Sequence, residues 1–163
     1  QTKLNWNLNK THILFPSNPA RPEKNFKLLK DGINQIENIE IQIHTLIDLP
    51  HKKIPFYFNA ADIVVMTSLW EGSPNAIKEA LACNRVIVST KVGDIEYLLG
   101  DVDGTFICKS QEKSELVKSL IDAIEYFKII KVSKGRDSII RKGIDSVSIA
   151  KRIINLYTSI KNN

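Results

Sequence analysis

Short apolar runs alternate along the chain with segments in which apolar residues recur every three or four positions. The runs at 62–67 (DIVVMT) and 86–89 (VIVS) are rich in Ile and Val without polar alternation, which is typical of strands buried on both faces. Residues 12–16 (HILFP) predict a third buried strand that ends at a proline. Residues 39–45 alternate apolar and polar positions and predict a strand, and a further short strand is predicted at 105–108.

Helices are predicted between and after these strands. They lie at 25–36, 54–61, 74–83, 95–99 and 113–127, and a last helical stretch runs from about 135 to 160. Alternating strands and helices indicate the α/β class, with a parallel sheet covered by helices on both faces. The loops after the carboxyl ends of parallel strands share one edge of the sheet. Because open α/β sheets bind ligands at that edge, we expect the functional site there.

The composition is that of one globular domain, because the chain has 163 residues of which 43% are hydrophobic. Cys83 and Cys108 have no second cysteine or histidine two to five residues away, so neither a disulfide framework nor a zinc site is predicted. No apolar run approaches the roughly 20 residues of a transmembrane helix, and residues 1–5 do not resemble a signal peptide. These features favour a soluble protein of the cytoplasm.

Positive charge is concentrated near the carboxyl end of the chain. The formal net charge is +5. Residues 129–163 contain eight Lys and Arg against two Asp, so they carry +6 and the remaining residues carry −1. No recognised nucleic-acid-binding module accompanies this charge, and no nucleic-acid partner is expected. We interpret the basic helical tail at about 135–160 as a packed helix with a solvated face, and peripheral contact with an anionic membrane is the alternative.

The loop after the strand at 62–67 carries the densest chemistry in the chain, with the sequence S-L-W-E-G-S-P-N-A-I-K-E-A. Ser73 and Pro74 predict the N-cap and the first residue of the following helix. The first amides of that helix and its dipole would then form a site for phosphate or another anion at the ligand-binding edge. Gly72 would let the backbone turn closely.

Two carboxylates flank this anion site. About 10 Å separates the backbones of Glu71 and Glu79 if the helix intervenes, which is more than a double-displacement glycoside hydrolase requires. Two carboxylates at successive depths of one cleft suit the hydroxyl groups on either side of a diphosphate, as in a nucleoside diphosphate sugar. The alternative is that Glu71 caps the loop and Glu79 is a solvated helix residue.

Three stretches carry a resemblance to a known family: 59–68 (NAADIVVMTS), 71–83 (EGSPNAIKEALAC) and 85–99 (RVIVSTKVGDIEYLL). They closely resemble the donor-binding half of family 4 (group 1) retaining glycosyltransferases, whose E-x(7)-E signature is matched by Glu71 and Glu79. These enzymes have the GT-B architecture, in which two Rossmann-like domains face each other across a cleft. The resemblance covers nearly the whole chain. It implies that 1–163 is the single C-terminal, nucleotide-sugar-binding domain, and that the covalently linked N-terminal acceptor domain is absent.

The resemblance also implies roles for individual residues. Glu71 would bind hydroxyls of the transferred sugar, and Glu79 would bind those of the ribose. Lys24 occupies the position of the family's usual lysine, whose ammonium neutralises the diphosphate and helps its departure. The family's usual arginine position holds Pro19, and Arg21 is the nearest arginine. Catalysis is thus assigned to Glu71 and Lys24, and donor binding to Arg21, Gly72, Ser73, Pro74, Asn75, Ala76 and Glu79.

Besides Pro19, two positions depart from the family pattern. Asn84 stands where a glycine usually ends the helix, and asparagine can also adopt the left-handed conformation needed there. The family's double glycine after the next strand is reduced to one in Val92-Gly93-Asp94. These departures leave the fold prediction intact and alter the expected shape of the sugar pocket.

The resemblance predicts the donor domain of a hexosyltransferase that uses a UDP- or GDP-sugar and requires neither a metal nor another cofactor. The chain alone is expected to be inactive, because its acceptor domain is missing. Its expected place is the cytoplasm, with the inner face of a membrane as the alternative. A non-catalytic nucleotide-binding or interaction domain of the same fold remains the alternative function.

Overall fold

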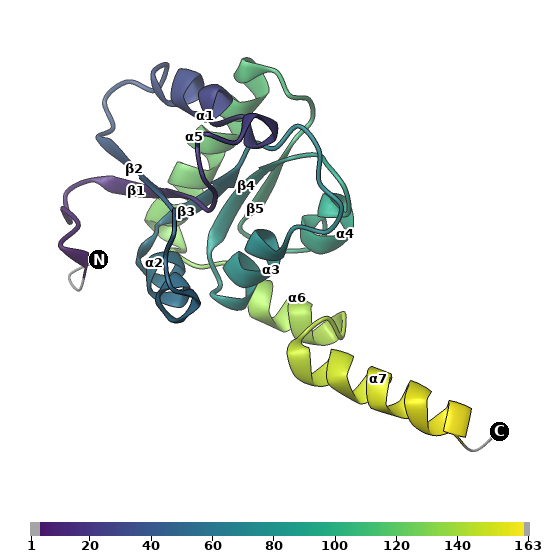
Figure 1. Ribbon diagram of the computed structural model, residues 1–163. Helices are drawn as coiled ribbons and strands as arrows, with labels where there is room; N and C mark the ends of the chain where they lie inside the picture. Colours follow the sequence, from purple (N-terminus) through teal and green to yellow (C-terminus); the bar gives the residue numbers. More distant parts are fainter. Residues whose placement is uncertain (1–3, 162–163) are drawn as a thin grey trace.

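The protein forms a five-stranded, entirely parallel sheet over the part of the chain that the structure describes, residues 4–161 of a computed structural model (Figure 1). The strand order is β2-β1-β3-β4-β5. This arrangement confirms the predicted α/β class. The strands are β1 (Thr11–Phe15), β2 (Ile41–Thr45), β3 (Ile63–Met66), β4 (Val86–Thr90) and β5 (Thr105–Cys108).

Helices cover both faces of the sheet, as the continuous apolar runs predict. The helices are α1 (Phe26–Ile33), α2 (Ile54–Ala60), α3 (Asn75–Ala82), α4 (Ile95–Leu99), α5 (Lys113–Ile129), α6 (Gly135–Arg141) and α7 (Ser146–Lys161). Short 3₁₀ turns precede α1 at Pro22–Lys24 and α2 at His51–Lys53.

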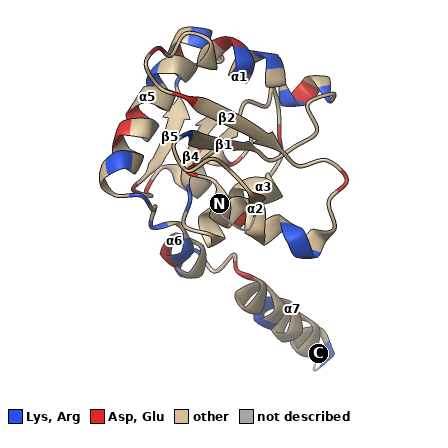
Figure 2. Ribbon diagram, turned by 90° about the vertical axis from the view of Figure 1, so that its left-hand side faces the viewer, with Lys and Arg blue, Asp and Glu red and all other residues tan. Residues whose placement is uncertain are grey.

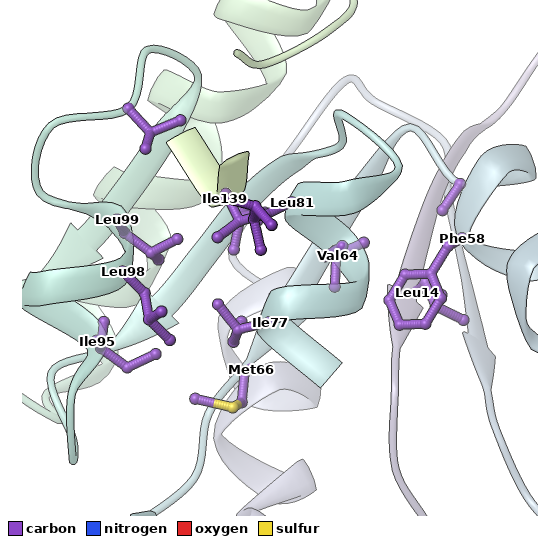
Figure 3. Close-up of a cluster of buried hydrophobic side chains, with 14 residues drawn as sticks. Leu14, Phe58, Val64, Met66, Ile77, Leu81, Ile95, Leu98, Leu99 and Ile139 are labelled. Atoms are coloured by element: carbon purple, nitrogen blue, oxygen red, sulfur yellow. The ribbon is translucent and has the colours of Figure 1, made fainter. Parts of the chain in front are cut away.

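Successive residues of each central strand enter opposite cores, because side chains alternate between the two faces of a strand. Leu14 of β1 and Val64 of β3 pack with α2, α3, α4 and α6 in the core that Figure 3 shows. Their neighbours Ile13 and Val65 pack with α1 and α5 on the other face. Burial on both faces explains why these strands contain almost no polar residue.

The carboxyl end of the chain differs from the single helical stretch predicted at 135–160. It forms two helices, because Gly143 has a positive φ of 61° and Asp145 caps a new helix. The carboxylate of Asp145 accepts hydrogen bonds from the amides of Val147 and Ser148, both at 3.0 Å. Helix α6 packs against α3, whereas α7 extends away from the domain and has no buried residue (Figure 1).

A histidine pair joins the two strands at the β2 side of the sheet. The Nδ1 atom of buried His12 lies 2.9 Å from Nε2 of His44, and the ring of Trp6 stacks on His44 with centroids 3.4 Å apart. Burial, and to a smaller extent His12, lowers the pKa of His44 to about 4. His44 is therefore neutral near pH 7. Nε2 of His12 also lies 2.7 Å from the carbonyl oxygen of Asn7, so the pair anchors the segment before β1.

Candidate functional site

The strand order creates a crevice between the loops that follow β1 and β3. The chain leaves β1 toward β2 on one side and leaves β3 toward β4 on the other, so the two loops diverge above the carboxyl edge. A pocket of about 90 Å³ lies between them. This volume is below that of a site enclosing a drug-sized ligand, so only part of a nucleotide sugar fits within it. Its lining residues are Phe15, Pro16, Ser17, Lys24, Met66, Ser68, Glu71, Pro74, Asn75 and Ala76.

Lys24 and Glu71 meet across this crevice. The Nζ atom of Lys24 forms an ion pair with Oε1 of Glu71, and each side chain is only 16% exposed. Thr67, at the end of β3, donates its hydroxyl to the backbone carbonyls of Lys24 at 3.0 Å and Asn25 at 2.9 Å. The turn that carries the lysine is therefore fixed to the strand that precedes the glutamate.

Ser68 is a site residue that the sequence prediction missed. It is completely buried, and its hydroxyl donates to Oε1 of Glu71 at 2.8 Å. Its own carbonyl accepts a hydrogen bond from the hydroxyl of Thr90 at 2.7 Å, which ties it to β4. The sequence feature that could have indicated it is the abrupt change from apolar residues to Thr67 and Ser68 directly after a buried strand.

The loops after β3 and β4 contact each other closely. Gly93 has a positive φ of 54°, and a Cβ atom there would lie 2.1 Å from the carbonyl oxygen of Gly72. That same carbonyl accepts a hydrogen bond from the amide of Asp94 at 3.1 Å. A Cβ on Gly72 would meet no atom within 4 Å, so the close approach expected at Gly72 requires a glycine at Gly93 instead.

The expected N-cap at Ser73 is wrong. The N-cap is Pro74, which has extended dihedral angles, and α3 begins at Asn75. The Ser73 hydroxyl donates to the carboxylate of Asp94 at 2.5 Å and does not cap the helix. Because Pro74 is extended, Ser73 lies two residues before the first helical residue and outside the N-cap position. The start of the helix still faces the pocket, because Asn75 and Ala76 line it.

Glu79 lies one helical turn beyond Asn75 and lines a different hollow. That hollow has a volume of about 150 Å³ and is otherwise lined by His51, Ile54, Pro55, Phe58, Ala82 and Cys83. Oε1 of Glu79 is 3.9 Å from Nε2 of His51. Partial burial raises the pKa of Glu79, and His51 partly offsets this effect. The structure thus places the two glutamates in separate hollows along α3.

Only some of the predicted site residues line the pocket between the loops after β1 and β3. Arg21 is largely exposed and forms an ion pair with Glu23 at 2.5 Å. Asn84 has the expected left-handed conformation, with φ of 52°. The pocket brings together Lys24, Glu71, Pro74, Asn75 and Ala76, whereas Arg21, Gly72, Ser73 and Glu79 are not among its lining residues.

Within residues 4–161, no group of three or more His, Cys, Asp or Glu side chains is arranged to hold a metal ion. In the same part of the chain, no helix is both long and apolar enough to cross a bilayer.

The family model described as glycosyl transferases group 1 matches residues 18–126, which include the loop after β3 and most of the loop after β1. The chain belongs to the group 1 glycosyltransferases. Among individual proteins, one relative is the GPI3 subunit of phosphatidylinositol N-acetylglucosaminyltransferase from Saccharomyces cerevisiae, which is 31% identical over 136 residues. The alignment covers 81% of this chain and 30% of GPI3, so this glycosyltransferase chain spans less than a third of that relative.

Solved structures show the same fold at low sequence identity. Sucrose-phosphate synthase from Thermosynechococcus elongatus has a TM-score of 0.84 at 14% identity, covering 99% of this chain and 48% of that one. HepE from Anabaena, solved in complex with UDP and glucose, has a TM-score of 0.71 at 19% identity and covers 93% and 49%. This group 1 glycosyltransferase chain therefore has the Rossmann-like fold of one half of a GT-B architecture.

Proposed function

We propose that this chain is the donor-binding domain of a retaining family 4 hexosyltransferase that uses a UDP- or GDP-sugar. The observation that supports this most is the meeting of Lys24 and Glu71 beside the start of α3. One cation and helix amides suit a diphosphate, and the adjacent carboxylate suits sugar hydroxyls. The complex of HepE with UDP and glucose supports the same class of donor.

The donor extends along α3 in this proposal. Its diphosphate lies at Lys24 and the amides of Asn75 and Ala76, and its sugar lies against Glu71. The ribose hydroxyls reach Glu79, and the base lies beside the apolar residues around it. A donor in this position spans both hollows, which is consistent with neither hollow alone being large enough for it.

Lys24 and Glu71 would contribute at different points of the transfer. As the bond between the anomeric carbon and the diphosphate oxygen breaks, negative charge accumulates on the departing diphosphate. The Lys24 ammonium and the α3 amides stabilise that charge. Glu71 accepts hydrogen bonds from sugar hydroxyls and keeps the anomeric carbon facing the acceptor hydroxyl. The oxygen of that hydroxyl forms the new bond, and its proton passes to the departing diphosphate.

Titration with UDP and with GDP tests the proposal. Wild-type chain should bind at least one of them, with chemical-shift changes at the amides of Asn75 and Ala76. Lys24→Ala should weaken binding on the order of 10- to 100-fold, because a charge-assisted contact to phosphate is lost. Lys27→Ala is the matched control, since Lys27 is 82% exposed and pairs with Asp31 on α1. Equal loss in both variants, or no shift near α3, would contradict this assignment.

We further propose that an N-terminal acceptor domain completes the enzyme and packs against α7. Apolar side chains along α7 are 39–71% exposed, among them Ile149, Ile153, Leu156, Tyr157 and Ile160. The sucrose-phosphate synthase match covers 99% of this chain within a protein about twice as long, which supports a second half that covers this face. Lys and Arg residues occur on both α6 and α7 (Figure 2). Arg141 and Lys142 pair with Asp101, so fewer cations are free for a membrane.

Paired substitutions on α7 test this docking. In the full-length protein, Ile153→Asp should lower the melting temperature and reduce transfer at least about 10-fold, since a buried charge opposes packing. Asn155→Asp, on the opposite side of the helix, should change neither. In the 163-residue chain, which should transfer no sugar, both variants should melt like wild type. Salt-sensitive sedimentation with anionic vesicles, lost on Lys151→Gln and Arg152→Gln, would favour the membrane instead.

A further inference from the structure

One oxygen of Glu71 is shared by two donors. Oε1 accepts the hydroxyl of Ser68 at 2.8 Å and forms the ion pair with Nζ of Lys24. Among the described residues, Glu71 is the only hydrogen-bond and ion-pair partner found for that ammonium group. The cation that the proposed function assigns to the diphosphate is therefore neutralised by the carboxylate assigned to the sugar.

Donor binding has to change this arrangement. A diphosphate carries more negative charge than one carboxylate, and it also meets the first amides of α3, so it competes for the Lys24 ammonium. When the ammonium leaves, Glu71 keeps its second hydrogen bond, the one from Ser68. Without that bond, the Glu71 side chain would regain rotational freedom when the sugar hydroxyls need a fixed hydrogen-bond acceptor.

We propose that the Lys24 ammonium leaves Glu71 and pairs with the diphosphate when the donor binds. Ser68 is the positioning residue that holds Glu71 toward the sugar during this exchange. The inference rests on the proposed donor-binding function and adds two roles to it. Glu71 restrains the lysine when the site is empty, and Ser68 acts on the sugar only through Glu71.

The surroundings allow this division between fixed and moving groups. Ser68 is fully buried, and Thr90 holds its carbonyl at 2.7 Å, so its short side chain has a fixed origin. Thr67 holds the backbone of Lys24 and Asn25 in the same way. Only the flexible stem of Lys24 has to move, because four rotatable bonds separate its ammonium from the anchored backbone.

The first test measures UDP binding to the 163-residue chain by titration calorimetry. Glu71→Gln should tighten binding of free UDP on the order of 10-fold, because removing the carboxylate charge frees Lys24 for phosphate. Asp31→Asn removes the acidic partner of a different lysine, Lys27, and should leave UDP affinity unchanged. Unchanged or weaker UDP binding by Glu71→Gln would overturn the exchange.

The second test separates positioning from structural support. Ser68→Ala should keep the UDP affinity within about twofold of wild type. The ratio of the affinity for the preferred sugar nucleotide to the affinity for its free nucleotide should fall on the order of 10-fold. The probes are UDP-glucose, UDP-N-acetylglucosamine and GDP-mannose, with UDP and GDP as references. Ser68→Thr, which retains the hydroxyl, should restore that preference.

The outcomes also distinguish this inference from the proposed function. A Ser68→Ala variant that loses UDP and sugar nucleotide affinity equally, together with a lower melting temperature, would show a merely structural role and overturn the positioning. If the wild-type chain binds UDP while Glu71→Gln and Ser68→Ala behave like wild type, the inference fails and donor binding stands. If no nucleotide or sugar nucleotide binds the wild-type chain, the proposed function fails first.

Discussion

Gly93→Ala is expected to destabilise the domain by about 3 kcal/mol and to abolish nucleotide binding, because it forces apart the two loops beside the site. The new Cβ would lie 2.1 Å from the carbonyl oxygen of Gly72 and 2.7 Å from that of Glu71. Both are backbone atoms, so no side-chain rotation relieves the clash. The positive φ of 54° adds strain for any residue with a Cβ.

Urea denaturation and UDP titration measure the two effects of Gly93→Ala. Gly72→Ala is the matched control, because a Cβ at that position meets no atom within 4 Å. It should leave the free energy of unfolding within about 0.5 kcal/mol of wild type. If the Gly93→Ala and Gly72→Ala variants had the same free energy of unfolding, the contact between the loops after β3 and β4 would not be needed to maintain the site.

Glu79→Gln should weaken UDP and UDP-sugar alike, on the order of 10- to 100-fold, while slightly stabilising the protein at pH 7. The binding loss follows from a lost charged hydrogen bond to the ribose hydroxyls. The gain in stability follows from burial, which raises the pKa of Glu79 in the folded state. The glutamine removes that cost without changing the shape of the side chain.

The sign of the stability effect comes from proton linkage. Since the folded-state pKa is raised, the folded protein binds more protons than the unfolded chain just above the ordinary pKa, so this group's contribution falls as pH rises through the folded pKa. Glu79 is 40% exposed, and solvent reduces the effect to less than about 1 kcal/mol.

Melting temperatures at pH 5 and pH 7 and UDP titrations check both effects of Glu79→Gln. The exposed Glu96 provides a matched control, because Glu96→Gln should alter neither stability nor binding by a measurable amount. A Glu79→Gln variant that is less stable at pH 7 but binds UDP normally would contradict the proposed role of Glu79 and the effect of its burial.

The sequence alone predicted those features whose cause is local. Apolar runs at 62–67 and 86–89 predicted central strands, because a strand buried on both faces cannot contain regular polar positions. Helical spacing predicted α1 to α5 with ends close to those observed. The resemblance also identified the group 1 glycosyltransferases and named Lys24 and Glu71, although it did not predict that their side chains pair with each other.

Only the tertiary structure decided which side chains meet. Lys24 and Glu71 are 47 residues apart, and their pairing depends on the neighbouring positions of β1 and β3 in the sheet. The Ser73 hydroxyl donates to Asp94, 21 residues further along the chain, and α3 begins at Asn75 because Pro74 is extended. Position 93 requires a glycine because the backbone carbonyl of Gly72, in the loop after β3, lies close to it. Periodicity reports which side of an element is buried, but such contacts between distant segments depend on strand register and loop paths.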